Sequence, residues 1–249
     1  MKVFLTGANG VAEAIKRGCG TLLISRKSNR ADDLERLADE HGVPIRWVGG
    51  KTLTRLTGNM RHRGYAMETS ERRESGAIRS LRDIETANGG NSLVILLDGV
   101  TDPRNLGAVI RAAEQFRALA VIVPKRRSAG GDADILSRTS AGAIEWIPLL
   151  KVPNVARTLG ELKDMGFWVW GADAGGTSIL EINLMGRIAL VMGREGEGLH
   201  RLVRKSCDGL LRIPVSGSLD SLNVATAAGI LMYEVRRQQD ACARSQRQA

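Results

Sequence analysis

LVILLDGVTDPRNLGAVIRAAEQFRALAVIV, residues 93–123, contains two apolar runs, LVILL and LAVIV, on either side of a helical pattern. Neither run alternates polar and apolar residues, so we expect strands that are buried on both faces. Between the runs, Val109, Ala112 and Phe116 recur at helical spacing along one face. A buried strand, a helix and a second buried strand predict parallel strands joined by a crossover helix.

The same alternation continues toward the C-terminal end. Further apolar runs read FWVWG, IALVM and LLRIP, each bounded by Gly, Pro or charged residues. A last helix is expected over residues 221–237, and its predicted inward face is formed by Leu222, Ala225, Ala228, Ile230, Leu231 and Val235. Residues 92–249 are therefore predicted to form an α/β domain around a parallel sheet.

Residues 1–66 are predicted to form a smaller, separate α/β unit. Residues 67–91 are polar, charged and poor in large apolar side chains, which predicts an interdomain linker with a short helix over residues 77–84. Within the first unit, the expected elements are helices over residues 10–17 and 31–41 and strands over residues 21–25 and 44–48.

FLTGANGVAEAI, residues 4–15, resembles the start of a dinucleotide-binding domain, in which a glycine-rich turn places backbone amides against a pyrophosphate. The third glycine of that pattern is replaced by Ala12 or Glu13, and a glutamate repels phosphate. The chain also has no Tyr-x-x-x-Lys pair, because its tyrosines are Tyr65 and Tyr233. A structural turn is favoured over a dehydrogenase site.

The charge of the chain favours a polyanionic partner. The formal net charge is +9 and the isoelectric point is about 10.0. Residues 1–92 hold 16 basic and 11 acidic residues, a net charge of +5. Residues 93–249 hold 20 basic and 16 acidic residues, a net charge of +4. Because Lys and Arg displace counterions from phosphates, a nucleic-acid surface that spans both parts is expected, with a solvated basic surface as the alternative.

Other protein classes are disfavoured. No apolar run approaches the roughly 20 residues of a membrane helix, and the N-terminal apolar run is too short for a secretory signal. Cys19, Cys207 and Cys242 are widely spaced, without a CxxC pair or a histidine cluster. We expect a cytoplasmic protein with reduced thiols and no metal site.

Three segments place small or polar residues after apolar runs: LLDGVTDPRNLGAVIRAAEQF (residues 96–116), LVMGREGEGL (residues 190–199) and IPVSGSLDSLNVATAAGILMYE (residues 213–234). In an α/β sheet, ligands bind where loops leave the carboxyl ends of the strands. One site built from three loops is the economical interpretation.

Together these segments resemble the SpoU/TrmH family of RNA ribose 2′-O-methyltransferases, members of the SPOUT superfamily that use S-adenosylmethionine. VIVPK at residues 121–125, continuing into Arg127, Ser128 and Ala129, further resembles the subgroup that methylates a guanosine in large-subunit (23S-type) ribosomal RNA. The motif residues stand in the family's order: Asn105 and Arg111, then Gly193, Glu195 and Gly198, then Ser221, Leu222, Asn223 and Val224.

The resemblance also implies residue roles. An arginine is too strong a cation to act readily as a base, so Arg111 is expected to contact a phosphate and orient the reacting hydroxyl. Asn105 stands where a helix N-cap is expected, which is the alternative to a role in substrate positioning. The catalytic constellation implied by the resemblance is Asn105, Arg111, Glu195, Ser221 and Asn223. The implied cofactor-binding residues are Gly193, Ile213 and Leu222.

Further implications concern the architecture. The family forms a deep trefoil knot near the C-terminus and a homodimer in which Arg111 or its neighbours serve the partner's site. GANGVAEAIKRG (residues 7–18) and HRGY (residues 62–65) are similar to an N-terminal RNA-binding domain of ribosomal-protein type. Ribosomal RNA is the expected partner; transfer RNA as the substrate and a non-catalytic RNA-binding protein remain the alternatives.

Overall fold

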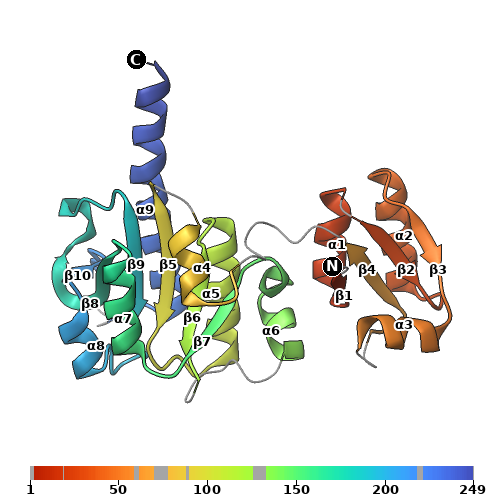
Figure 1. Cartoon of the computed structure of the whole chain (residues 1–249), viewed down its shortest axis with the longest axis horizontal. Coiled ribbons are helices and arrows are strands. Elements are labelled where there is room, and N and C mark those ends of the chain that lie inside the picture. The colour runs from red at the N-terminus through yellow and green to blue at the C-terminus, as the bar shows by residue number, and fades with distance from the viewer. Residues whose placement is uncertain are drawn as a thin grey trace.

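The computed structural model describes residues 3–18, 20–58, 62–69, 78–87, 90–125, 133–217 and 221–248. Two α/β domains lie side by side, and the long C-terminal helix projects beyond the larger one (Figure 1). Two units were expected from the sequence, and the described residues form two separate sheets. The continuation into Arg127, Ser128 and Ala129 lies outside the described residues.

The N-terminal domain is a four-stranded sheet of order β1-β4-β2-β3. Alternate residues of β2 face opposite layers: Leu22 and Ile24 pack with α1 and α2, whereas Leu23 packs with α3. This two-sided burial explains the apolar run of β2. The elements are β1 (Val3–Leu5), α1 (Ala8–Lys16), β2 (Thr21–Ile24), α2 (Asn29–Glu40), β3 (Ile45–Trp47), α3 (Gly50–Thr57) and β4 (Tyr65–Thr69).

The predicted boundary of this domain was wrong by at least three residues. The linker was expected to begin at residue 67, but β4 continues to Thr69 and pairs with both β1 and β2. The polar composition of the segment concealed the strand. Helix α4 (Leu81–Thr86) belongs to the C-terminal domain, because Ile84 packs in its core and the backbone oxygen of Ile84 accepts from Arg187 at 2.9 Å.

The C-terminal domain contains a six-stranded sheet of order β10-β8-β9-β5-β6-β7, in which every strand pair is parallel, as predicted. Its strands are β5 (Ser92–Leu97), β6 (Ala120–Pro124), β7 (Leu149–Val152), β8 (Trp168–Ser178), β9 (Arg187–Met192) and β10 (Gly209–Arg212). Its further helices are α5 (Pro103–Gln115), α6 (Ala133–Thr139), η2 (Ala143–Glu145), α7 (Val155–Asp164), η3 (Ile179–Glu181), α8 (Arg201–Ser206) and α9 (Val224–Gln248).

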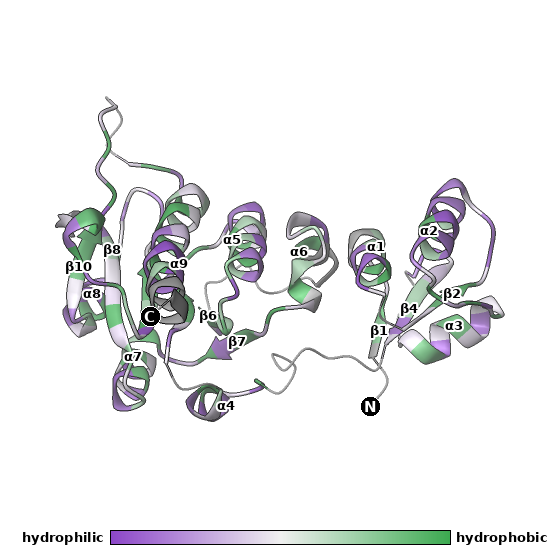
Figure 2. Cartoon of the chain, turned by 90° about the horizontal axis from the view of Figure 1, so that it is seen from above, coloured by the Kyte–Doolittle hydropathy of each residue, from purple (hydrophilic) through white to green (hydrophobic). Residues whose placement is uncertain are grey.

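Two apolar cores cover the two faces of this sheet. Leu93, Ile95 and Leu97 of β5 pack with α5, α6 and α9, whereas Val94 and Leu96 pack with α4, α7 and α8. Figure 2 shows the two helical layers on opposite sides of the sheet. Burial of both faces is the physical reason why the strand sequences lack alternation.

Two details of the C-terminal domain differ from the prediction. Strand β7 was not predicted, because Lys151 interrupts its short run at the edge of the sheet. The last helix begins at Val224 rather than at residue 221, and Ile230 is exposed although it was assigned to the buried face. Met232, which was not assigned to that face, is buried, whereas Leu231 and Val235 are buried as predicted.

Close helix packing fixes the position of α5. A Cβ atom at Gly107 would lie 2.2 Å from Oγ1 and 2.6 Å from the carbonyl carbon of Thr139 on α6. The two helices can therefore approach this closely only with glycine at position 107.

Within the described residues, no helix is long and apolar enough to cross a membrane.

Candidate active site

The three motif segments meet at one edge of the C-terminal sheet. The first follows β5 after Leu97, the second follows β9 after Met192, and the third follows β10 after Arg212. Because β10, β8, β9 and β5 pair in parallel, their carboxyl ends lie at the same edge. This edge is where open α/β sheets bind ligands.

A chain of side-chain hydrogen bonds joins the three segments. The Nδ2 atom of Asn223 donates to Oδ1 of Asn105 at 3.0 Å. The Nδ2 atom of Asn105 donates to Oε2 of Glu195 at 3.4 Å, a longer contact. Asn105 thus uses both ends of its amide between residues that are 90 and 118 positions away in the sequence.

The local structure explains how two of these residues are held. Helix α5 is capped by Asp102, whose carboxylate accepts from the backbone N–H of Arg104 at 2.8 Å, and Pro103 opens the helix. Asn105 therefore lies inside the first turn, and the expectation that it is the N-cap was wrong. At the third segment, Oδ1 of Asn223 accepts from the backbone N–H groups of Ala225 and Thr226 at the start of α9.

Arg111 is not part of this hydrogen-bonded chain. It begins the third turn of α5, later than the one or two turns expected. Six residues separate it from Asn105, which places the two about 120° apart around the helix. Its side chain is exposed and makes no hydrogen bond or ion pair with any described residue. The charge of Arg111 is thus available to an anion from outside the protomer.

Tight backbone geometry holds the second segment. Arg194 and Gly198 exchange two backbone hydrogen bonds of 2.9 Å, and Gly198 has a φ of 69°. A Cβ atom at Gly193 would lie 2.2 Å from the carbonyl carbon of Gly198. The loop therefore folds back on itself only with glycine at position 193, and it presents the exposed carboxylate of Glu195 at its tip.

The remaining predicted residues lie near the start of the third segment. Ile213 is partly buried and packs against the core under α5 and α9, and Leu222 is also partly buried. Ser221 is exposed, and its hydroxyl makes no hydrogen bond to the described residues. Residues 218–220 lie outside the described part of the chain.

Asp98 and His200 form a contact that the sequence reasoning missed. Asp98 follows β5 directly and is 5% exposed. Its Oδ2 atom accepts from the backbone N–H of His200 at 2.8 Å and contacts Nδ1 of the same residue at 3.0 Å. The contact ties the end of the glycine loop to β5. The sequence feature that could have identified Asp98 is its position directly after a buried strand, in LVILLD.

Cys207 is a further titratable group of the C-terminal domain, and it belongs to none of the three segments. The Cys207 thiol packs beside the core, and burial raises its pKa to about 11. Within the described residues, no group of three or more His, Cys, Asp or Glu side chains is arranged to hold a metal ion. A cavity of about 800 Å³ opens beside Ser92, at the amino end of β5; Gln115, Phe116 and Tyr233 from the helical ends of two motif segments line it, but none of the predicted catalytic or cofactor-binding residues does.

Comparison with known proteins assigns the chain to a class of RNA-modifying enzymes. Residues 92–233 match the model of the SpoU rRNA Methylase family, and residues 4–75 match a model described as RNA 2'-O ribose methyltransferase substrate binding. The first match covers more than half of the chain, so the chain belongs to the SpoU rRNA methylase family. The resemblance seen in the three motifs is thereby confirmed, and the second match passes the domain boundary expected at residue 66.

The relatives are similar over nearly the whole chain. A 23S rRNA (guanosine-2'-O-)-methyltransferase RlmB of Xylella fastidiosa (strain 9a5c) is 38% identical over 246 residues, 94% of this chain and 96% of the relative. An RlmB of Ralstonia nicotianae is 40% identical over 215 residues, 86% of this chain and 85% of the relative.

A solved structure agrees with the fold. The SpoU methyltransferase AviRb from Streptomyces viridochromogenes, crystallised in complex with AdoMet, superposes with a TM-score of 0.66 at 24% identity. The superposition covers 96% of this chain and 91% of that chain. At this identity the likeness supports the fold alone.

Proposed function

We propose that the chain transfers a methyl group from S-adenosylmethionine to the ribose 2′-hydroxyl of a guanosine in 23S ribosomal RNA. The observation that carries the proposal is the hydrogen-bonded chain of Asn223, Asn105 and Glu195 at the carboxyl edge of the sheet. Membership of the SpoU rRNA methylase family supports the reaction, and the relatives named as 23S rRNA guanosine methyltransferases support the substrate.

The residues of the second and third segments fit an adenosine-containing cofactor. The glycine loop presents backbone groups with little side-chain bulk at Gly193, and Ile213 and Leu222 keep part of their apolar surface accessible. A few polar groups beside apolar walls are what an adenosine needs. Gly193, Ile213 and Leu222 are the residues that would hold the cofactor, which supplies a sulfonium-activated methyl group when bound.

The polar residues of the site act on the RNA. As the new C–O bond forms and the bond from the methyl group to sulfur breaks, the 2′-hydroxyl must lose its proton to solvent water, so the hydroxyl has to be held in line with the methyl group. We assign Arg111 to a phosphate beside the target ribose, where its positive charge stabilises the developing oxyanion; it stays protonated and does not accept the proton. Asn105, Glu195, Ser221 and Asn223 orient the ribose, with Glu195 and Asn223 fixing the amide of Asn105.

The finer architecture is also part of the proposal. Helix α9 follows the edge strand β10, yet it packs on α5 near the middle of the sheet, a return path that is compatible with a trefoil knot. Arg111 points away from the Asn105 chain on its own protomer, which supports a homodimer whose sites are completed by the partner's α5.

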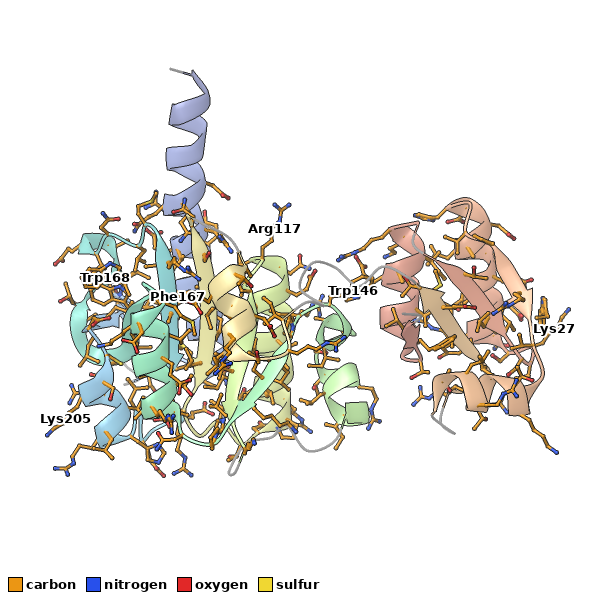
Figure 3. The ribbon with its side chains drawn as sticks, in the orientation of Figure 1. Lys27, Arg117, Trp146, Phe167, Trp168 and Lys205 are labelled. Carbon is orange, nitrogen blue, oxygen red and sulfur yellow. The ribbon has the colours of Figure 1, made fainter. Side chains whose placement is uncertain are left out.

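The N-terminal domain is assigned to capturing the RNA. Strands β1, β2 and β3 run in one direction, with β4 antiparallel to β1 and β2, so the loops after β2 and β3 meet the start of β4 at one edge. That edge carries exposed basic side chains without a described ion pair: Arg26, Lys27, Lys51 and Arg63. Figure 3 shows Lys27 at the rim of this domain. We propose this basic edge as the RNA contact.

The test is transfer of labelled methyl groups from S-adenosylmethionine to protein-free 23S ribosomal RNA and, separately, to total transfer RNA. The ribose-methylated position is then mapped. Label at one guanosine of the ribosomal RNA is expected. Label in transfer RNA alone would keep the chemistry and overturn the substrate, and cofactor binding without transfer to either RNA or to an assembling large subunit would make the chain a non-catalytic RNA-binding protein.

A further inference from the structure

The two domains contact each other through a charged pair. Arg17 caps the C-terminal end of α1, and its Nη2 atom donates to Oε1 of Glu114 on α5 at 3.1 Å. The Glu114 side chain is 6% exposed, and its other carboxylate oxygen accepts from the amide of Gln115 at 2.8 Å. The N-terminal domain is thus joined to a buried carboxylate of the C-terminal domain.

Trp146 extends this contact into the core of the N-terminal domain. It follows η2 in the C-terminal domain, yet it is buried in the same apolar cluster as Val11 and Ile15 of α1. The guanidinium carbon of Arg17 lies 4.5 Å from the centroid of the Trp146 ring. Figure 3 shows Trp146 on the side of its domain that faces α1. A cation over an indole ring is attracted by the negative face of the ring.

Arginine suits this position better than an apolar residue would. Its flat guanidinium stacks on the Trp146 ring and donates to Glu114 at the same time, so the contact fixes an orientation as well as a distance. Burial acts to lower the pKa of Arg17, but the hydrogen bonds and charge attraction of Glu114 and Glu13 outweigh it and raise that pKa. Arg17 therefore stays charged in the interface.

Glu114 connects this contact to the active site. It lies on α5 three residues, or about one turn, after Arg111, and Asn105 lies on the same helix. We propose that Arg17, Glu114 and Trp146 form an interdomain latch that fixes the N-terminal domain relative to α5. The latch rests on the proposed function in one respect: an RNA that contacts both domains is presented to Arg111 at a fixed spacing. Arg17 is then a positioning residue.

The first part of the test measures docking of the domains, without RNA. Arg17→Met, Glu114→Gln and the double variant are compared with the parent by hydrogen exchange of α1 and by small-angle scattering. Arg36→Met is the matched control. This substitution removes the same charge from the same domain, but from an exposed ion pair with Asp33. Faster exchange and a larger radius of gyration are expected for Arg17→Met and not for the control.

The second part measures methyl transfer. Arg17→Met is expected to raise KM for RNA several-fold, while kcat and cofactor affinity stay unchanged, because the residues of the active site are untouched. The loss of RNA affinity in the double variant is expected to be smaller than the sum of the losses in the two single variants. The reason is that removing both partners leaves no buried carboxylate without its cation. Arg17→Lys, which keeps the charge, is expected to restore part of the lost affinity.

The outcomes separate the latch from the proposed function. Unchanged exchange and scattering in Arg17→Met, or fully additive losses, would overturn the latch. Lost docking with an unchanged KM would overturn the positioning role. If the parent protein methylates no RNA, the proposed function fails, whereas exchange and scattering still decide whether the latch exists.

Discussion

The two domains gather different side chains at the corresponding edges of their sheets. In the C-terminal domain, the carboxyl edge gathers glycines and a chain of amides and a carboxylate, Asn223, Asn105 and Glu195. In the N-terminal domain, the corresponding edge gathers basic side chains such as Lys27 and Arg63. Topology decides where loops converge, and the residues in the loops decide what happens there. The contrast predicts that substitutions in the N-terminal domain alter RNA affinity. Substitutions at the edge in the C-terminal domain are predicted to alter the chemical step.

The largest effect is expected at Arg111. Arg111→Ala removes the charge that we propose stabilises the reacting oxygen, so kcat for methyl transfer is expected to fall roughly 100- to 1,000-fold. Because the side chain has no described partner, the melting temperature is expected to stay unchanged. Arg157→Ala, on the exposed surface of α7, serves as the control. Full activity of Arg111→Ala would remove this residue from the mechanism.

Cys207 tests how tightly the C-terminal core is closed. Burial raises the pKa of its thiol to about 11, so far less thiolate is present at pH 8 than in an exposed cysteine. Alkylation of Cys207 by iodoacetamide, followed by peptide mass spectrometry, is expected to be about 100-fold slower in the native protein than in urea. Equal rates in the two states would mean that this core opens readily.

Gly107 tests whether α5 needs its close contact with α6. Gly107→Ala places a methyl group against Thr139 and is expected to lower the free energy of unfolding by about 1–3 kcal/mol. Gly160→Ala on α7 meets nothing within 4 Å and is the matched control, with an expected gain of about 0.5–1 kcal/mol. Urea denaturation measures the free energy of unfolding of both variants. Equal values for Gly107→Ala and Gly160→Ala would contradict the close packing of α5 on α6.

The smallest effect is expected at the basic edge of the N-terminal domain. Lys27→Ala is expected to weaken RNA binding a few-fold and to reduce the slope of log affinity against log salt by about 1, with kcat unchanged. Arg36→Ala, on an exposed face of α2, is the control. A lower kcat in Lys27→Ala would break the proposed division of labour between the domains.

Much of the fold could be predicted because burial leaves a mark in the sequence. Strands β5, β6 and β9 are almost fully buried, β8 and β10 place apolar residues such as Val169 and Leu211 in the core, and the apolar runs identified all five. Strands β1, β4 and β7 were missed; Lys151 in β7 and Glu68 in β4 give these two segments the composition of a surface. Ile230 was misassigned for the converse reason: an apolar residue on a long helix can also be exposed.

The sequence by itself determined the α/β class, the parallel sheet, the family and the three segments that we propose carry the chemistry, because burial and motif residues are local properties of the chain. Only the tertiary structure decided that Asn105 is held between Asn223 and Glu195 rather than capping α5, that Asp98 holds His200, and that Arg17 reaches Glu114. These contacts join residues about 90 or more positions apart. Their geometry depends on strand order and helix packing, which no local pattern encodes.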